Sequence, residues 1–310
     1  SVSIKTKINA SCNGSNNGAL DINVTGGTSP YTYQWSNGPT TEDIAGLAAG
    51  TFFVTVTDTK GCSKTFSDTI TQGGSVAVST ASKTNITCFG GANGTVVLSV
   101  AGGSSPYTYL WSNAATMASL SGLVAGNYSV TVTDSSNCKK TATFIISQPT
   151  ALTVSFGSQL NVSCNGGNNG SVAAVAAGGT PPYTYSWNNG ATTSNINNLT
   201  SIVIAVTVTD TAGCIANSGA GAITQPTVLD ASVSSSVNNS ACAANDGTIT
   251  ISITGGENTV YTYQWSNGAT SASLSGLAAG TYTVIVKNGN NCSDTTAATV
   301  TQPGTLSVSL

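Results

Sequence analysis

The chain has 310 residues, with only 6% charged residues, 35 Gly, no His and a formal net charge of −3. A chain of this length usually holds more than one domain. All eight basic residues are Lys, and they form no basic stripe, which excludes a nucleic-acid partner. Apolar runs such as residues 202–206 are far shorter than the roughly 20 residues that cross a bilayer, so we expect no membrane insertion of this segment.

One motif recurs four times along the chain. Each copy reads Tyr-Thr-Tyr-x-Trp-x-Asn, and the four Trp are spaced by 76, 76 and 78 residues. Such self-similarity indicates a tandem array. Boundaries placed at a recurring Gln predict repeats at residues 1–72, 73–148, 149–225 and 226–302, with residues 303–310 as the start of a truncated fifth repeat, so we expect the segment to come from a longer array.

Within the first copy, apolar residues recur at every second position over residues 20–24, 31–35 and 52–56. A period of two is typical of half-buried strands. The turn signals Asn17-Gly18, Gly26-Gly27 and Asn37-Gly38 separate these segments. We expect about six or seven strands per copy and an all-β fold of tandem immunoglobulin-like antiparallel β-sandwich repeats.

Two cysteines occur in every copy, always 50 residues apart, whereas the distance from one copy's second Cys to the next copy's first drifts through 26, 26 and 28. The constant spacing favours one disulfide inside each repeat, closing a ring worth roughly 4 kcal/mol in the chain-entropy model. A metal site is the alternative, but the sequence has no Cys-x-x-Cys pair and no His. Structural disulfides indicate an extracytoplasmic compartment. The predicted pairs are Cys12 with Cys62, Cys88 with Cys138, Cys164 with Cys214, and Cys242 with Cys292.

The four Trp can be interpreted as sugar-stacking platforms or as core residues. In the first copy, Tyr31, Tyr33 and Trp35 alternate and therefore share one face of a strand. Sandwiches bury such a Trp against a disulfide. We predict that the aromatic core residues are Trp35, Trp111, Trp187 and Trp265.

An acidic residue lies four positions before the second Cys in three copies, at Asp58, Asp134 and Asp210. Calcium ligation and the capping of a type I turn both use Asp here. The fourth copy has Asn288, and the two middle copies carry one carboxylate each. Since hard-cation sites gather several carboxylates, the pattern favours turn caps and predicts no metal site and no cofactor.

Catalytic residues are also missing from the pattern. Without His there is no ordinary Ser-His or Cys-His pair, and a single carboxylate in each middle copy cannot supply the two acids of a glycosidase. We therefore expect no catalytic residue and no enzymatic activity.

Several motifs together resemble one known family. They are Cys-Asn-Gly-Gly-Asn-Asn-Gly at 164–170, Gly-Leu-x-Ala-Gly-x-Tyr at 122–128 and 276–282, and Thr-Val-Thr-Asp-x-x-x-Cys at 131–138. The chain resembles the SprB-type repeats of giant cell-surface proteins of Bacteroidetes, including gliding-motility adhesins. The third copy departs from the pattern at 201–204, where Ser-Ile-Val-Ile replaces the Ala-Gly-x-Tyr turn, so we expect a looser or differently packed corner there.

The resemblance implies export by the type IX secretion route and display at the cell surface in a thread that touches the substratum. Exported proteins of that phylum are similar in carrying O-glycans on Thr or Ser that follows Asp. That pattern marks Thr69, Thr211 and Thr295 as candidate O-glycosylation sites.

The linkers suggest how the copies are arranged. After Gln148-Pro149 the chain continues directly into an apolar alternating segment, with no long Gly/Ser spacer. We therefore expect neighbouring repeats of the same chain to abut as an elongated rod with a structural and adhesive role. The alternatives are an array that binds surface glycans or the substratum through exposed loops, and repeats that self-associate through sheet edges into an extracellular fibre.

Overall fold

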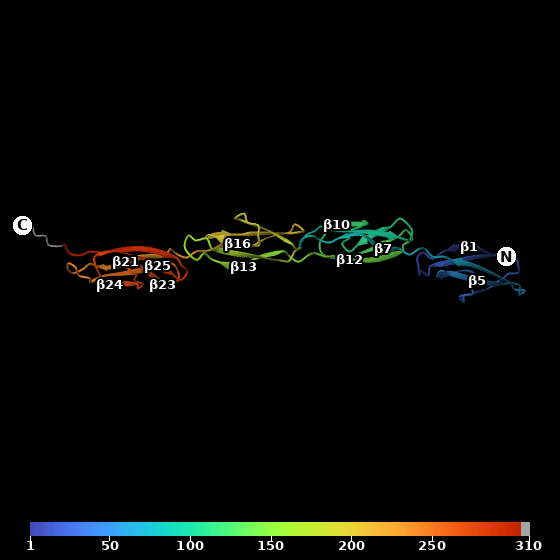
Figure 1. Cartoon of the computed structure of the whole chain (residues 1–310). Coiled ribbons are helices and arrows are strands. Elements are labelled where there is room, and N and C mark those ends of the chain that lie inside the picture. Colours follow the sequence, from blue (N-terminus) through green and yellow to red (C-terminus); the bar gives the residue numbers. More distant parts are fainter. Residues whose placement is uncertain (305–310) are drawn as a thin grey trace, which may run out of the picture. The chain divides into compact units, whose positions relative to one another are not determined.

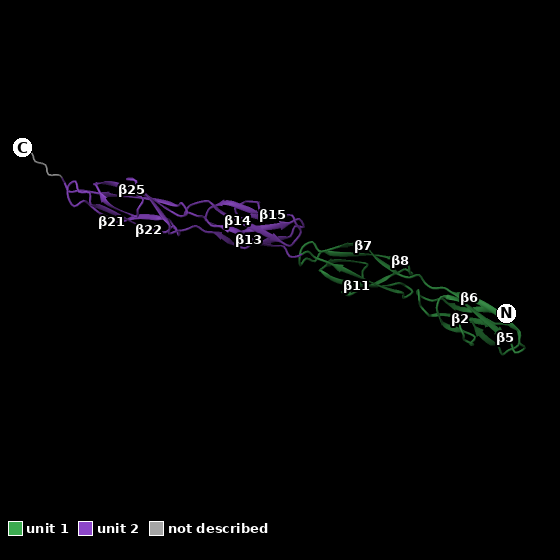
Figure 2. Ribbon diagram, turned by 60° about the horizontal axis from the view of Figure 1, so that its bottom comes forward, with its two compact units in different colours: residues 1–149 green, residues 150–310 purple. Residues whose placement is uncertain are grey.

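The computed structural model describes residues 1–304, and every regular element within them is a β-strand (Figure 1). The chain divides into two compact units, Ser1–Pro149 and Thr150–Leu310 (Figure 2). Each unit contains two sandwiches, and each sandwich has its own cluster of buried apolar side chains.

The first repeat is built from two three-stranded antiparallel sheets. One sheet has the order β1-β2-β4 and the other β3-β5-β6. The strands are β1 (Val2–Ile8), β2 (Gly18–Val24), β3 (Thr32–Trp35), β4 (Ile44–Leu47), β5 (Gly50–Thr57) and β6 (Ser63–Ile70). Their core contains Leu20, Ile22, Trp35 and Val54, which are inward-facing members of the alternating segments.

The second and fourth repeats have the same two-sheet arrangement. The second contains β7 (Ala77–Thr84), β8 (Gly94–Ala101), β9 (Thr108–Trp111), β10 (Ser119–Leu123), β11 (Gly126–Thr133) and β12 (Lys139–Ile146). The fourth contains β21 (Asp230–Val237), β22 (Gly247–Thr254), β23 (Tyr261–Trp265), β24 (Ser273–Leu277), β25 (Gly280–Asn288) and β26 (Ser293–Val300).

The third repeat differs where its sequence departs from the motif. Its strands are β13 (Thr153–Leu160), β14 (Gly170–Ala177), β15 (Tyr183–Trp187), β16 (Asn195–Leu199), β17 (Ile202–Ile204), β18 (Val206–Asp210), β19 (Ile215–Asn217) and β20 (Gly221–Ile223). The long hairpin β11-β12 of the second repeat corresponds here to two short pairs, β18-β19 and β17-β20. Ser218 interrupts the ladder, because its hydroxyl accepts the N–H of Val206 at 3.1 Å.

The sequence-based fold class is confirmed as an all-β array of small immunoglobulin-like antiparallel sandwiches. Successive side chains of a strand point to opposite faces of its sheet, so an alternating sequence gives each sheet one apolar face. Two such faces packed against each other form the core of a sandwich.

Each repeat has two ends, which we call the leading pole and the trailing pole. In the first repeat, the leading pole contains the start of β1 and the β5-β6 turn, where the Thr59 N–H donates to the Thr28 carbonyl. The trailing pole contains the β1-β2 loop and the end of β6, where the Ala10 N–H donates to the Thr71 carbonyl. Strands β1 and β6 therefore run in the same direction, from one pole to the other.

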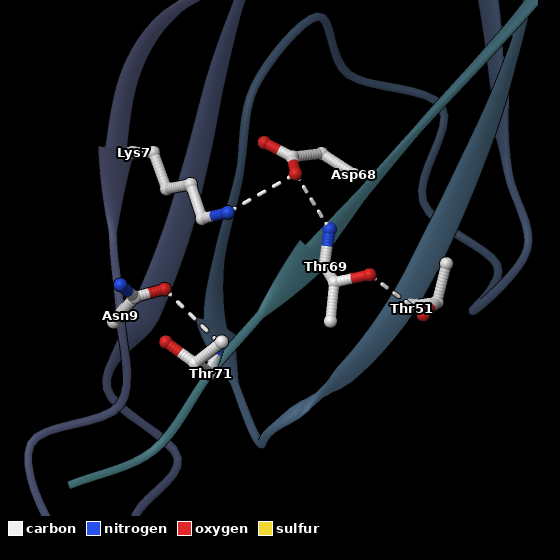
Figure 3. Close-up of polar contacts among 6 residues, drawn as sticks. All are labelled: Lys7, Asn9, Thr51, Asp68, Thr69 and Thr71. Carbon is white, nitrogen blue, oxygen red and sulfur yellow. Dashed lines mark hydrogen bonds and ion pairs between the residues drawn. The ribbon is translucent and has the colours of Figure 1, made fainter.

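Side chains join β1 to β6 near the trailing pole (Figure 3). The Lys7 ammonium lies 3.0 Å from an Asp68 carboxylate oxygen, and the Asn9 amide oxygen accepts the Thr71 N–H at 3.0 Å. Asn85, Asn161 and Asn238 accept an equivalent backbone N–H in the other repeats. These bonds close one side of the sandwich between its two sheets.

Candidate functional site

The two cysteines of a repeat lie at opposite poles. In the first repeat, Cys12 lies in the β1-β2 loop at the trailing pole, and Cys62 lies in the β5-β6 turn at the leading pole. The eight residues of β6 separate these poles, a span of roughly 26 Å at about 3.3 Å per residue. A disulfide needs Cα atoms less than about 7 Å apart, so the two cannot bond.

The prediction of one disulfide inside each repeat is therefore wrong. The structure joins Cys12 to Cys138 and Cys164 to Cys292, each with a Cα–Cα distance of 5.5 Å. Both bonds connect the first Cys of one repeat with the second Cys of the next. The constant 50-residue spacing reflects equal strand lengths and not a covalent partner.

The remaining cysteines divide into two kinds. Cys88 and Cys214 are also disulfide-bonded, whereas Cys62 and Cys242 are free and exposed. Since every predicted pair contains a cysteine that is bonded elsewhere or free, none of the four predicted pairs forms.

Backbone contacts support the junction between the first and second repeats. The Gly73 N–H donates to the Ala10 carbonyl at 3.1 Å, and a Cβ at Gly73 would overlap the Ser11 carbonyl oxygen. That same carbonyl oxygen lies 3.2 Å from the Cys138 sulfur. The linker, the Cys12 loop and the second repeat thus meet at one point.

The recurring Gln that marks the repeat boundaries has a structural role at the trailing pole. The side-chain oxygens of Gln72, Gln148 and Gln225 accept the N–H of Gly14, Gly90 and Gly166, at 3.4, 2.8 and 2.8 Å. The side chain therefore binds the linker to the loop that carries the first Cys. In the sequence this Gln marks only the repeat boundaries, and nothing in its spacing indicates the hydrogen bond that it makes.

The leading pole of a repeat receives the incoming linker on a Gly-Gly pair. In the second repeat, a Cβ at Gly102 would overlap the Ser75 carbonyl oxygen, and a Cβ at Gly103 would lie 2.7 Å from a Val76 methyl group. Val76 is itself buried. Leu152 and Leu229 occupy the same place over Gly179 and Gly256. The linker thus inserts one aliphatic side chain into each pole that it covers.

The residue four positions before the second Cys caps its turn in every repeat. One carboxylate oxygen of Asp134 accepts the N–H groups of Ser136 and Cys138, and the other accepts the N–H of Ser104 at 2.9 Å. Asp58 and Asp210 make the same three bonds.

In the fourth repeat, Asn288 reverses the polarity of one of these bonds. Its oxygen accepts two N–H groups as Asp does, but its Nδ2 donates to the Gly256 carbonyl at 2.9 Å. Asp and Asn can therefore both cap this turn, because Asp accepts a third backbone N–H where Asn donates to a backbone carbonyl.

These bonds shift the acidity of the carboxyl groups. The N–H of Ser104 is the main cause that lowers the pKa of Asp134 below its ordinary value. For Asp58 the main cause is the N–H of Cys62, followed by that of Thr28. Donors aimed at a carboxylate favour its charged form, so these residues are held ionised as structural acceptors.

All four Trp side chains are buried, with 2–3% of their surface exposed. Each indole N–H donates to a backbone carbonyl six residues further on, for example from Trp35 to Thr41 at 3.0 Å. The expected disulfide neighbour is replaced by an aromatic ring in two repeats, Phe144 beside Trp111 and Phe156 beside Trp187. Buried indoles leave no ring face for stacking a sugar.

The three candidate O-glycosylation sites are exposed. The Thr69 hydroxyl lies 2.8 Å from that of Thr51 on the neighbouring strand (Figure 3), and the Thr211 hydroxyl donates to the Thr180 carbonyl. Thr295 lies on β26 opposite Ile285 of β25.

Within residues 1–304, no group of three or more His, Cys, Asp or Glu side chains is placed to hold a metal ion. The described part of the chain also contains no helix of the length and apolarity needed to cross a membrane.

The family model described as the SprB repeat matches the chain four times, at residues 5–40, 80–116, 157–192 and 234–270. Each match begins within or beside the first strand of a repeat and includes its first Cys and its Trp. Each of the four copies thus contains a match to the SprB repeat, which supports assignment of the chain to this repeat family. A search of curated proteins finds no match.

Solved structures with tandem domains show only distant likeness. The three N-terminal domains of the outer capsid protein Hoc of bacteriophage RB49 share 16% identity, with a TM-score of 0.38, covering 75% of this chain and all of that one. A tetra-tandem repeat from the extending region of a large adhesion protein shares 16%, with a TM-score of 0.31 and coverages of 96% and 98%. A Ca²⁺-stabilised, ice-binding adhesin of an Antarctic bacterium shares 18%, with a TM-score of 0.30 and coverages of 97% and 98%. These likenesses are too weak to bear on function.

Proposed function

We propose that the chain is a load-bearing segment of an exported adhesin-type surface protein. The observation that carries this proposal is that consecutive repeats are joined by disulfides in addition to the polypeptide. A disulfide inside a repeat would limit the unfolding of that repeat alone, whereas a disulfide across a junction transmits tension from one repeat to the next.

The path of tension follows from the two bonds. Force applied at the two ends passes along residues 1–12, across the Cys12–Cys138 bond, along residues 138–164, across the Cys164–Cys292 bond and along residues 292–310. Only 58 of 310 residues lie on that path. Each repeat contributes one strand to it, namely β1, β12, β13 and β26. The other strands are shielded from the load.

Single-molecule stretching between terminal handles tests the proposal. At about 3.4 Å per residue, the oxidised chain can extend to only about 200 Å before a covalent bond breaks, and the reduced chain to about 1,000 Å. The Cys62→Ser, Cys242→Ser double variant is the control, because it removes only free thiols. Repeat-sized unfolding steps in the oxidised chain would contradict the proposed tension path.

Cross-repeat disulfides support an extracellular or surface location, because such bonds persist in oxidising compartments. Origin in Bacteroidetes, type IX secretion and a part in gliding motility belong to the same proposal and rest on the SprB-repeat match. The role is structural and not enzymatic. Isolation of the chain from the surface of intact cells, with its disulfides formed, is the expected finding.

The rival glycan-binding role has less support. The four indoles are buried, and the Gly14–Asn17 loop is tied to the trailing pole through Gln72 and Ser11. A glycan array probed with the full chain is expected to give no binding that depends on Trp. O-glycosylation at Thr69, Thr211 and Thr295 stays a proposal, supported by their exposure, and is tested by the intact mass of native material.

A further inference from the structure

A groove recurs at the same place in the first and fourth repeats, beside the edge strands β3 and β23. Its volume is about 470 Å³ in the first repeat and about 430 Å³ in the fourth. In the first repeat its walls include Thr32, Tyr33, Gln34, Thr40, Thr55 and Thr57. The equivalent six residues line the groove of the fourth repeat, where Ile285 and Lys287 replace Thr55 and Thr57. Each groove lies within one repeat, so it depends on no junction between repeats.

The groove of the first repeat is lined by hydroxyl and amide groups, and none of its lining side chains is charged. Two of the hydroxyls are held in place on the outer face of the sheet. Thr32 donates to the Thr57 carbonyl at 3.3 Å, and the Thr55 hydroxyl lies 3.3 Å from that of Thr65. A hydroxyl has one proton and two lone pairs, so these groups can still accept hydrogen bonds from a ligand.

Gln34 distinguishes these two grooves from the corresponding surface of the other repeats. Its side chain is exposed, and its amide nitrogen donates to the Trp35 carbonyl at 3.3 Å. Gln264 occupies the same position in the fourth repeat, whereas Leu110 and Ser186 occupy it in the second and third. The four Thr positions of the first groove are Thr in the second and third repeats as well, so the side-chain amide is the group by which the grooves differ from them.

The edge of β3 adds a backbone donor and a backbone acceptor to the groove. The Ser36 N–H donates to the Phe53 carbonyl across the β3-β5 pair, whereas the Trp35 N–H points the other way and donates to the Pro39 carbonyl. Successive residues of a strand direct their backbone groups to opposite sides. The N–H and C=O of Tyr33 therefore point away from β5, at the free edge that borders the groove.

An added peptide strand would fit this edge poorly. Strand β3 has only four residues, and the Trp35 N–H is already bonded to Pro39. Tyr33 is thus the one residue of β3 whose backbone a peptide could pair with, and very short edge strands of this kind protect sheets against strand addition.

A saccharide matches the groove better. Each sugar hydroxyl both donates and accepts hydrogen bonds, so it complements the Thr hydroxyls, the Gln amide and the backbone groups of Tyr33. In the fourth groove, Lys287 supplies further N–H donors. The volumes of 470 and 430 Å³ lie within the range of about 300–1,000 Å³ that is typical of small-ligand sites. Since the first groove has no charged lining residue, a neutral saccharide suits it best.

We propose that the grooves beside β3 and β23 bind a neutral oligosaccharide, and that Gln34 and Gln264 select it. The inference goes beyond the load-bearing role, because it adds two adhesion points to the array. It does not involve the four indoles, which are buried, or the Gly14–Asn17 loop. The grooves contain no cysteine, so failure of this proposal would leave the proposed tension path unaffected.

The test titrates the full oxidised chain with maltohexaose, cellohexaose, xylohexaose and mannohexaose, and with hexagalacturonate as the charged comparison. Chemical shifts of the backbone amides report both affinity and location. We expect at least one neutral sugar to bind with a Kd of about 1 mM or below, with shift changes confined to the grooves of the first and fourth repeats. Binding of none of the four neutral sugars, tighter binding of hexagalacturonate, or shift changes elsewhere would each overturn the proposal.

The Gln34→Leu, Gln264→Leu double variant tests the selecting residues. It gives each groove the residue that the second repeat has at this position, Leu110, so the fold should tolerate it. We expect the affinity for the bound sugar to fall about tenfold, because each site loses the hydrogen bonds of one amide.

The Ser67→Ala, Ser232→Ala double variant is the matched control, since both hydroxyls are exposed and lie outside the two grooves. It should bind the sugar as the wild type does. Unchanged affinity in the Gln variant, or an equal loss in the two variants, would overturn the proposal. Should the Gln variant not fold, the location of the shift changes in the unmodified chain still decides.

Discussion

At the scale of single residues, the junctions depend on positions where only Gly fits. Gly103 has φ of 66°, and a Cβ there would lie 2.6 Å from an Asp134 carboxylate oxygen and 2.7 Å from a Val76 methyl group. The Asp134 carboxylate is held by its hydrogen bonds in the turn cap, and Val76 is a buried side chain of the linker. Neither group can move without losing these contacts.

We expect Gly103→Ala to destabilise the protein by about 1–3 kcal/mol more than Gly90→Ala, because overpacking costs about that much. Gly90 is the matched control in the same repeat: its φ is 74°, and its Cβ would meet nothing within 4 Å. Chemical denaturation of both variants measures the difference. Equal midpoints would show that the linker does not pack on the Gly pair.

The turn caps make stability depend on pH. The pKa of Asp134 is lowered in the folded protein, mainly by the Ser104 N–H, so its contribution is present above the ordinary Asp value of about 3.9. That contribution is lost as pH falls through the lowered value, because the unfolded chain binds the proton more readily.

The Asp134→Asn variant should therefore be less stable than the wild type at pH 7 and should lose less stability on acidification to pH 3. At neutral pH its amide Nδ2 would face the Ser104 N–H, so two donors would oppose each other. Melting temperatures at the two pH values provide the measurement. Asp230→Asn, at an exposed position on β21, is the control. A larger loss on acidification in Asp134→Asn than in the wild type would refute the assignment.

At the scale of strands and turns, periodicity was a good guide to the fold. The alternating segments at 20–24, 31–35 and 52–56 form β2, β3 and β5, and their inward members include Leu20, Trp35 and Val54 in one core. Alternation depends only on local geometry, since a pleated strand places every second side chain on the same face. That information is present in one sequence.

The covalent partners could not be predicted in the same way. Cys12 is 50 residues from Cys62 and 126 from Cys138, and both intervals recur from copy to copy with little change. Sequence spacing does not say which pole a loop occupies. That depends on the relative direction of β1 and β6, which is set by pairing across two sheets. The Gln and Gly-Gly contacts at the junctions were missed for the same reason.

The departure of the third copy at 201–204 was a correct indication of local change. Ala205 separates β17 from β18, and residues 218–220 separate β19 from β20. The Asn188 side-chain oxygen accepts the Ala205 N–H at 3.1 Å. The pattern predicted where the hairpin differs but not that both of its strands are divided.

Removing one cross-repeat bond tests its role at a single junction. In the Cys12→Ser, Cys138→Ser variant we expect both repeats to stay folded, because each has its own core. Unit 1 should lose up to about 5 kcal/mol against unfolding in the chain-entropy model, given a sequence separation of 126 residues. Denaturant titration measures the loss, and the Cys62→Ser, Cys242→Ser variant is the control. An unchanged midpoint in the first variant would show that the bond adds nothing to stability.

At the scale of the whole molecule, the disulfides change what a tandem array can do. An array with a bond inside each repeat lengthens under load whenever the segments outside the bonded loops unfold. With bonds across junctions, Cys12–Cys138 and Cys164–Cys292 bypass residues 13–137 and 165–291, so unfolding of the bypassed strands releases no length. Such an array suits a surface protein that must stay connected under drag.

Peptide mapping of the unreduced protein, after alkylation of free thiols, tests this account most directly. We expect linked peptides that join Cys12 to Cys138 and Cys164 to Cys292, with Cys62 and Cys242 recovered as alkylated thiols. Peptides that join Cys12 to Cys62, or Cys242 to Cys292, would contradict it, because each repeat would then be closed on itself and its neighbours joined by the polypeptide alone.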